Sequence, residues 1–253
     1  MSSEPTARQI MLLNKEDHRF HAIGPVGTGL GMIATTEFDP RDTSKTVSFG
    51  QPSASALFIN LAISSRLRRR DIDPIACFVD HPHPQGTFPE QHSKLFDYFE
   101  EFASEVIFSF LAIEAFVNEN ISSDFIYEIP KGTRKGQTLQ GEELQRNISL
   151  DDKIKSVLPL VTGTKSPAGL GVWEQYLHLK RLRDRITHLK SQDRSASGPE
   201  DKTIWGSMLE DTTLFFECAL SIMGSFPSLS LNRRWYQLAL AKTELPPEIR
   251  TLT

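Results

Sequence analysis

The segment of the chain with the most evident chemical potential is a run of positively charged side chains between Trp173 and Lys190. An arginine near a histidine suits the cleavage of RNA without a metal ion, because the ribose 2′-hydroxyl attacks the adjacent phosphorus while the imidazole moves its proton. The phosphorane gathers negative charge, which a guanidinium group stabilises through two parallel hydrogen bonds. The segment holds Lys180, Arg181, Arg183, Arg185 and Lys190, together with His178 and His188.

Three of these positions form the pattern Arg-polar-x-x-x-His, with Arg183, Asp184 and His188 as its defining residues. The pattern resembles the signature of the HEPN superfamily, whose second position is Asn, Asp or His. An earlier apolar stretch, Leu111 to Glu119, resembles a long helix of several HEPN families in which an embedded acid faces the motif; here that acid is Glu114. The resemblance covers roughly residues 90–226.

The resemblance implies a helical bundle that commonly dimerises, so that the Arg and His residues of two protomers line one cleft where RNA is cut to a cyclic phosphate. It implies that Arg183 stabilises charge in the transition state, that His188 is the general acid or base, and that Asp184 orients one of them. Residues expected to support the site or bind substrate are Glu114, Arg181, Arg185 and Lys190. No cofactor and no metal are expected.

The predicted function is therefore a metal-independent endoribonuclease of HEPN type, in a toxin or phage-defence setting. The expected partners are an RNA substrate, a second copy of the chain in a homodimer, and an antitoxin or regulatory protein. One alternative is a catalytically inactive HEPN-like module that binds RNA, nucleotide or a protein partner. Another is a helical interaction protein in which the motif is a coincidence.

The helical period sets a condition on the site. Arg183 and His188 are five residues apart, about 500° along a regular helix, and so lie about 140° from a shared face. They converge only if the helix starts or kinks locally, or if a second chain completes the site. Arg181 and Arg185 lie on the His188 side and could serve as the phosphate contact instead. Each residue also has a structural interpretation: surface charges that pair with neighbours, and for Glu114 a pairing with an arginine of the next helix.

Hydrophobic periodicity predicts the elements that hold this segment. Residues 90–121 contain no glycine or proline and should form a long helix, buried nearly all round between Val106 and Phe116. Ser149 and Asp152 form a capping box that begins a helix over 150–161, which Pro159 should truncate or kink. Further helices are expected over 172–190, 203–226 and 232–242. Trp205 should lie on the inner side of the helix over 203–226.

The rest of the chain is expected to be less regular. Glycine and proline in the first 50 residues indicate loops and short strands. Residues 53–70 predict a helix, with a strand over 56–63 as the alternative. Four prolines exclude a long helix between 71 and 89, and 130–141 and 191–201 should be loops. The predicted fold class is all-α, a HEPN-like bundle of four or more helices with an irregular N-terminal extension that could contain β-structure. The predicted divisions are 1–88, 89–228 and 229–253.

Two further clusters carry weaker hypotheses. The basic run from Arg66 to Arg70 could contact RNA phosphates or could be a solvated helix end that the helix dipole favours. His81 and His83, separated by one proline, make a poor metal site.

Composition limits the function classes. The chain has 253 residues, 39% hydrophobic and 24% charged, which permits a packed core. A net charge of −4 gives no overall attraction to nucleic acid, so any RNA contact must come from a local patch. Cys77 and Cys218 are expected to be buried core thiols. The polar start, Met1 to Gln9, and the lack of a long apolar stretch predict a cytoplasmic protein with no membrane partner.

Overall fold

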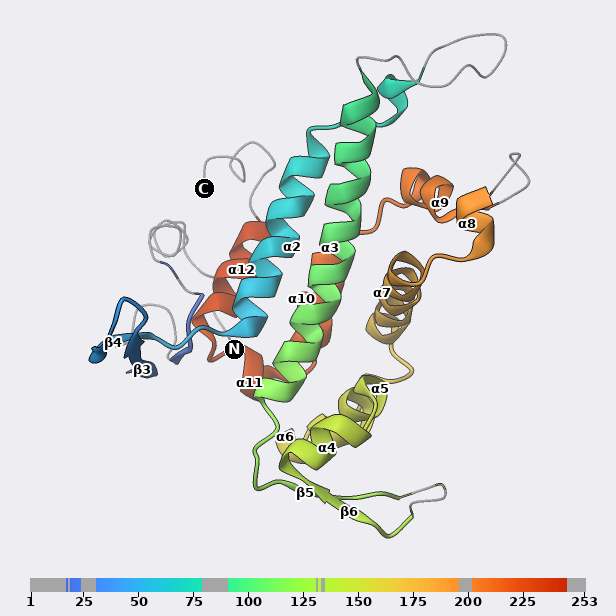
Figure 1. Cartoon of the computed structure of the whole chain (residues 1–253). Coiled ribbons are helices and arrows are strands. Elements are labelled where there is room, and N and C mark those ends of the chain that lie inside the picture. The colour runs from blue at the N-terminus through green and yellow to red at the C-terminus, as the bar shows by residue number, and fades with distance from the viewer. Residues whose placement is uncertain are drawn as a thin grey trace.

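Two long antiparallel helices form the centre of the molecule (Figure 1). The computed structural model describes residues 17, 19–23, 31–78, 91–130, 132, 135–195 and 202–244. Helix α2 spans Ala54–Arg70, and the Ser53 hydroxyl caps its start by accepting the Ala56 N–H at 3.3 Å. Helix α3 spans His92–Glu119, and half of the positions in its second half are buried. The helix expected over 53–70 is confirmed against its strand alternative, as is the long helix over 90–121.

Three more helices complete the bundle: α7 (Gly171–Thr187), α10 (Phe215–Gly224) and α12 (Arg234–Glu244). Helix α10 packs against α2, α3 and α7, while α12 packs against α2 and α10. Aromatic rings from different helices meet in this core; the Phe102 and Phe215 ring centroids are 5.5 Å apart, and those of Phe110 and Tyr176 are 6.3 Å apart. The expected helical bundle of four or more helices is confirmed.

Short helices connect these elements. They are η1 (Ile75–Cys77), α4 (Gly141–Asn147), α5 (Leu150–Asp152), α6 (Leu158–Thr162), α8 (Ser191–Ser195), α9 (Ile204–Glu210) and α11 (Pro227–Ser230). The capping box is confirmed, because the Ser149 hydroxyl accepts the Asp152 N–H at 3.1 Å. A π-helical turn, η3 (Lys153–Val157), precedes Pro159, which has no N–H to give to an earlier carbonyl. The helix continues past Pro159 to Thr162, so the proline does not truncate it, and the irregularity near the proline is this π-helical turn.

Small antiparallel hairpins lie outside the bundle. They pair β1 (Ala22–Ile23) with β2 (Gly31–Met32), β3 (Ala34–Asp39) with β4 (Asp42–Gly50), and β5 (Ile126–Glu128) with β6 (Thr138–Gln140). The first two confirm β-structure in the N-terminal region. The third corrects the loop expected over 130–141, part of which is strand β6, paired through Tyr127 and Leu139.

The single helix expected over 203–226 is wrong, because α9 and α10 are separate. The Asp211 carboxylate accepts the Thr213 N–H at 2.9 Å, and the Phe215 N–H that starts α10 donates to the Glu105 carboxylate of α3 at 3.0 Å. The first turn of α10 is therefore fixed by a tertiary contact rather than by α9. Trp205 is 38% exposed, not on an inner face. The loop expected over 191–201 instead begins with α8.

One hydrophobic core joins α2, α3, α7, α10 and α12. Helix α2, on the N-terminal side of the predicted 88/89 division, packs along α3, and α12, beyond the 228/229 division, packs on α2. Both cysteines are free and buried, as expected. Within the described ranges no helix is both long enough and apolar enough to cross a membrane. His81, His83 and the glycines at 27 and 29 lie outside the described residues.

Candidate functional site

The Arg-Asp-x-x-x-His segment occupies the last turn of α7 and the residue after it. Arg183 and Asp184 belong to the helix, whereas His188 follows its last residue, Thr187, with φ −127° and ψ 68°. The His188 N–H still donates to the Asp184 carbonyl at 3.0 Å. Because this hydrogen bond follows the α-helical pattern, the Cα atom of His188 is still in its helical position and only the chain after it departs from α7. The structure therefore does not remove the angular separation between Arg183 and His188 within one chain.

Arg183 is held against α3 as a positioned cation. Its guanidinium carbon lies 3.8 Å from the centroid of the Phe110 ring, a cation–π contact, and its Nη1 is 3.0 Å from the Asp184 carboxylate. The Nε atom is buried and has no hydrogen-bond partner among the described residues. The side chain as a whole remains 27% exposed. Asp184 thus lies where it orients Arg183, one of the two roles expected for it.

Three other residues of the expected site point their charge to solvent. His188, Arg181 and Lys190 are exposed. Within the part of the chain that the structure describes, none of the three side chains makes a hydrogen bond or ion pair. These three exposed groups and the partly exposed Arg183 are called the α7 patch below. Arg181 and Arg183 are two residues apart within α7, about 200° around the helix, so their guanidinium groups lie on different faces of it.

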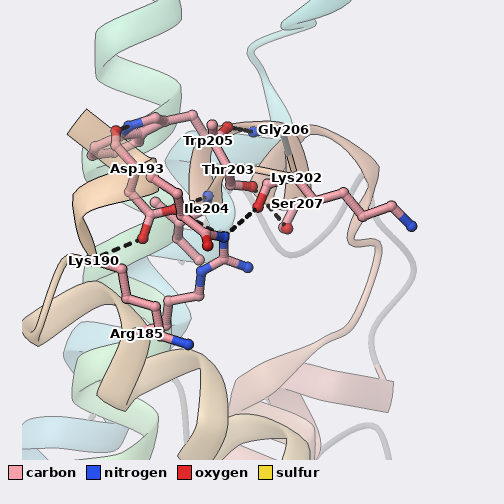
Figure 2. Close-up of polar contacts among 10 residues, drawn as sticks. Arg185, Lys190, Asp193, Lys202, Thr203, Ile204, Trp205, Gly206 and Ser207 are labelled. Carbon is pink, nitrogen blue, oxygen red and sulfur yellow. Dashed lines mark hydrogen bonds and ion pairs between the residues drawn. The ribbon is translucent and has the colours of Figure 1, made fainter. Parts of the chain in front are cut away.

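Arg185, in contrast, is a structural residue. Its Nη2 atom lies 2.8 Å from the Asp193 carboxylate and donates to the Lys202 carbonyl at 2.5 Å (Figure 2). Asp193 also accepts the Ile204 N–H at 2.7 Å and the Lys190 N–H at 3.1 Å. The hydrogen bond from Arg185 is the main reason that the pKa of Asp193 lies below its usual value. This cluster ties the end of α7 to α8 and α9, so Arg185 is not free to replace Arg183 as a phosphate contact.

Glu114 does not pair with an arginine. Its half-buried carboxylate has no ion pair within 4.0 Å among the described residues, and its charge acts on Lys153 and Tyr176 instead. Burial lowers the pKa of Lys153, and the negative charge of Glu114 partly offsets this decrease. The Lys153 ammonium donates to the Asn118 amide oxygen at 3.0 Å. The ion pair with an arginine that was expected for Glu114 is therefore absent from the described residues.

The ion pair that resembles this expectation is formed elsewhere on α3. Glu105 and Arg69 are completely buried and 2.7 Å apart, with the Arg69 guanidinium carbon 4.4 Å from the Phe102 ring centroid. Arg69 belongs to the basic run that was expected to face RNA or solvent. Neither the RNA contact nor the solvated helix end expected for this run applies to Arg69, because its side chain is inside the core. Arg68 is likewise paired, with Glu101.

A second polar contact of α7 was not foreseen. His178 Nε2 lies 2.8 Å from the Asp211 carboxylate, with the imidazole 41% and the carboxylate 15% exposed. Burial acts to raise the pKa of Asp211, but hydrogen bonds from Thr213 and His178 outweigh it and hold that pKa below its usual value. An imidazole oriented by a carboxylate is a recurring arrangement for a general base. The sequence gives no signal for it, because the two residues are 33 positions apart.

A third contact joins α7 to α5. The Asp151 carboxylate accepts the Tyr176 hydroxyl at 2.6 Å and the Lys180 ammonium at 2.7 Å. These contacts position the middle of α7. Among the residues that the structure describes, no cluster of three or more histidine, cysteine or acidic side chains is placed to hold a metal ion.

The arrangement is thus a guanidinium fixed on an aromatic ring in the last turn of α7, an exposed imidazole at the residue that ends this helix, and two further exposed cations in the same segment. Such a surface can bind a phosphodiester and can supply a group for proton transfer. No family model, curated protein or solved structure matches this chain.

Proposed function

We propose that the protein is a metal-independent endoribonuclease of HEPN type, acting in a toxin or phage-defence setting. The observation that carries the proposal is the placement of Arg183. Its guanidinium is held by Phe110 on one side and Asp184 on another, yet keeps an exposed portion near the helix end that His188 follows. A preorganised cation of this kind stabilises developing charge without reorganising at the moment of reaction.

In this proposal the RNA phosphodiester lies over the end of α7. Arg183 contacts a non-bridging phosphate oxygen and stabilises the charge of the phosphorane. His188 accepts the proton of the attacking 2′-hydroxyl or delivers one to the 5′-oxygen that leaves. The P–O5′ bond breaks as the P–O2′ bond forms, which gives a 2′,3′-cyclic phosphate and a free 5′-hydroxyl. Arg181 and Lys190 contact flanking phosphates, which adds salt-dependent affinity.

A single chain offers one exposed imidazole in this patch, whereas cleavage is most efficient with separate acid and base groups. Two copies that meet at their α7 ends would supply two imidazoles and two guanidinium groups to one substrate. We therefore propose a homodimer as the active species, with His188 of each copy taking one of the two proton-transfer roles.

A second candidate function is an inactive module that binds RNA or a protein partner. It is favoured by one observation: no described carboxylate or carbonyl orients the His188 ring. If the patch only binds, Arg183 and Lys190 would still contribute affinity, and His188 would be dispensable.

RNA cleavage in excess chelator tests the proposal. Wild type, His188→Ala, His178→Ala and a control variant at an exposed lysine elsewhere, Lys165→Ala, would be compared on tRNA and mRNA after each fold is verified by circular dichroism. We expect His188→Ala to lose about 100-fold or more, as removal of a general acid or base does, while Lys165→Ala retains wild-type activity. Arg183→Lys, which keeps the charge but not the fork, should also lose most of the activity.

Each other outcome has a defined meaning. Loss in His178→Ala with full activity in His188→Ala would transfer the base to the His178–Asp211 pair and refute the assignment of His188. No cleavage by wild type, with binding that depends on Arg183, would support the inactive module. Equal cleavage by all variants would refute the site.

A further inference from the structure

A pocket of about 180 Å³ lies among the second half of α2, the start of α10 and α12. Its wall is mostly apolar and is formed by Ile63, Leu67, Leu214 and Phe216. Three cationic side chains also line it: Arg66, Arg70 and Lys242. The pocket therefore combines an apolar surface with a concentration of positive charge.

Two of these cations form no ion pair with any carboxylate in the part of the chain that the structure describes. Arg66 is partly buried and makes no hydrogen bond or ion pair with any described residue. The Lys242 ammonium, also partly buried, has one weak contact, to the Asn60 amide oxygen at 3.5 Å. An unpaired cation away from water is costly, and such groups are usually paired.

The acidic groups close to the pocket are already engaged. Glu105 is buried and binds Arg69 at 2.7 Å, so these two charges offset each other. Asp71 is exposed and lies 3.4 Å from the Arg70 Nε atom. The charge of Glu105 also acts on Arg66, but neither Arg66 nor Lys242 forms an ion pair with a carboxylate of the described residues.

The electrostatic environment agrees with this description. Burial lowers the pKa of Arg66, and the charges of Arg69 and Arg70 lower it further, against a smaller opposite effect of Glu105. Burial also lowers the pKa of Lys242, and the charge of Arg19 acts in the same direction. An anion bound between Arg66 and Lys242 would favour the charged forms of both side chains and offset their repulsion by the neighbouring arginines.

We propose that this pocket binds a small phosphate monoester with an apolar organic group. The phosphate would lie between Arg66 and Lys242, and the organic group would lie against Leu67, Leu214 and Phe216. Two cations without an ion-pair partner among the described residues match a phosphate monoester, which carries about −1.5 to −2 at neutral pH, better than they match a single carboxylate. The pocket can hold a ring, since an apolar cavity of about 150 Å³ binds benzene.

The site is independent of the proposed RNA cleavage, because it shares no residue with the α7 patch and is tested by binding alone. The probe is phenyl phosphate, measured by isothermal titration calorimetry on the full chain. Arg66→Gln and Lys242→Gln each remove one cation, and Lys165→Gln removes an exposed one that is absent from the pocket. We expect wild type and Lys165→Gln to bind equally, and each pocket variant to bind roughly tenfold more weakly or worse, as expected for loss of a charge-assisted hydrogen bond.

Two further ligands test the two halves of the proposal. Inorganic phosphate lacks the ring and benzoate lacks the second charge, so each should bind more weakly than phenyl phosphate. Absence of phenyl phosphate binding to folded wild type would overturn the site, as would affinities unchanged in both pocket variants. Benzoate binding as tightly would overturn the phosphate head group, and inorganic phosphate binding as tightly would overturn the apolar contact. If Arg66→Gln fails to fold, Lys242→Gln alone decides the role of the cations.

Discussion

Replacing Asp193 should loosen the connection between α7 and α9. The carboxylate is fully buried and accepts three hydrogen bonds, from the Arg185 guanidinium and from the backbone N–H groups of Ile204 and Lys190 (Figure 2). In Asp193→Ala, Arg185 keeps one neutral acceptor, the Lys202 carbonyl. The Ile204 N–H, in a residue with no solvent exposure, loses its partner.

The size of the effect follows from these contacts. Loss of a hydrogen bond to a charged group costs about 1.5–3 kcal/mol, and a buried donor left without a partner costs about 1–3 kcal/mol. We therefore expect Asp193→Ala to lower the free energy of unfolding by about 3–5 kcal/mol. Asp193→Asn retains one oxygen that accepts from Arg185 and Ile204, but its amide group cannot accept the Lys190 N–H. We therefore expect this variant to lose only about 1–2 kcal/mol in the free energy of unfolding. Asp97→Asn, at an exposed position, serves as the control and should change little.

Urea denaturation measures these differences, and amide hydrogen exchange at residue 204 shows whether the segment opens locally. The difference also depends on pH. Because the folded-state pKa of Asp193 is held below its unfolded value of about 3.9, the carboxylate contributes its full stabilisation above that value and loses it as the pH falls through the folded-state pKa. The difference in the free energy of unfolding between wild type and Asp193→Asn should therefore have its full size at pH 7 and decrease below about pH 4. An Asp193→Ala protein within 1 kcal/mol of wild type, with unchanged exchange at residue 204, would refute this account.

Three more predictions follow from the buried groups. Arg69→Met and Glu105→Gln should each destabilise the protein by about 3–5 kcal/mol, because each leaves a buried charge unpaired. In a double-mutant cycle the double variant should lose less stability than the sum of the two single losses. Additive losses would contradict the pairing. Gly224→Ala places a Cβ 2.6 Å from the Tyr236 hydroxyl, which donates to a carbonyl of α10. Thermal unfolding should therefore show a loss of about 1–3 kcal/mol in the free energy of unfolding. A variant as stable as wild type would contradict this close contact. Burial raises the pKa of the Cys218 thiol to about 12, so a thiol reagent at pH 8 should label it only after unfolding; labelling of the native protein at the rate of a free thiol would contradict its burial.

The helices that the sequence predicts correctly are those whose signals are local. The long run without glycine or proline becomes α3, and the Ser149 capping box starts α5, because both depend on neighbours within four residues. The break between α9 and α10 depends instead on a hydrogen bond from Phe215 to Glu105, 110 positions earlier. The amphipathic pattern continues across that break, so periodicity alone predicts one helix.

The candidate site shows the same division. The sequence predicts one helix over 172–190 that contains Arg183, Asp184 and His188, whereas α7 ends at Thr187. The structure adds the Phe110 ring that holds the Arg183 guanidinium. Sequence reasoning grouped Arg185 with the site because charge and spacing do not reveal a partner such as Asp193, which lies beyond the helix end. Arg69 was misjudged for a related reason: a basic run indicates a solvated surface unless a buried carboxylate on another helix claims one of its members.

The Asp193 contacts also bear on the proposed catalysis. The chain leaves α7 at Thr187 and is fixed again at Lys190, whose N–H donates to Asp193, so His188 lies in a short span that is anchored at both ends. If His188 transfers the proton, freeing one anchor should reduce cleavage more than it reduces RNA affinity, because proton transfer depends on placement whereas phosphate contacts tolerate movement. Asp193→Ala should then cleave far more slowly than Asp193→Asn at equal RNA saturation. Full cleavage by an Asp193→Ala protein that shows fast exchange at residue 204 would mean that the placement of His188 does not matter, and that the imidazole is not the catalytic group.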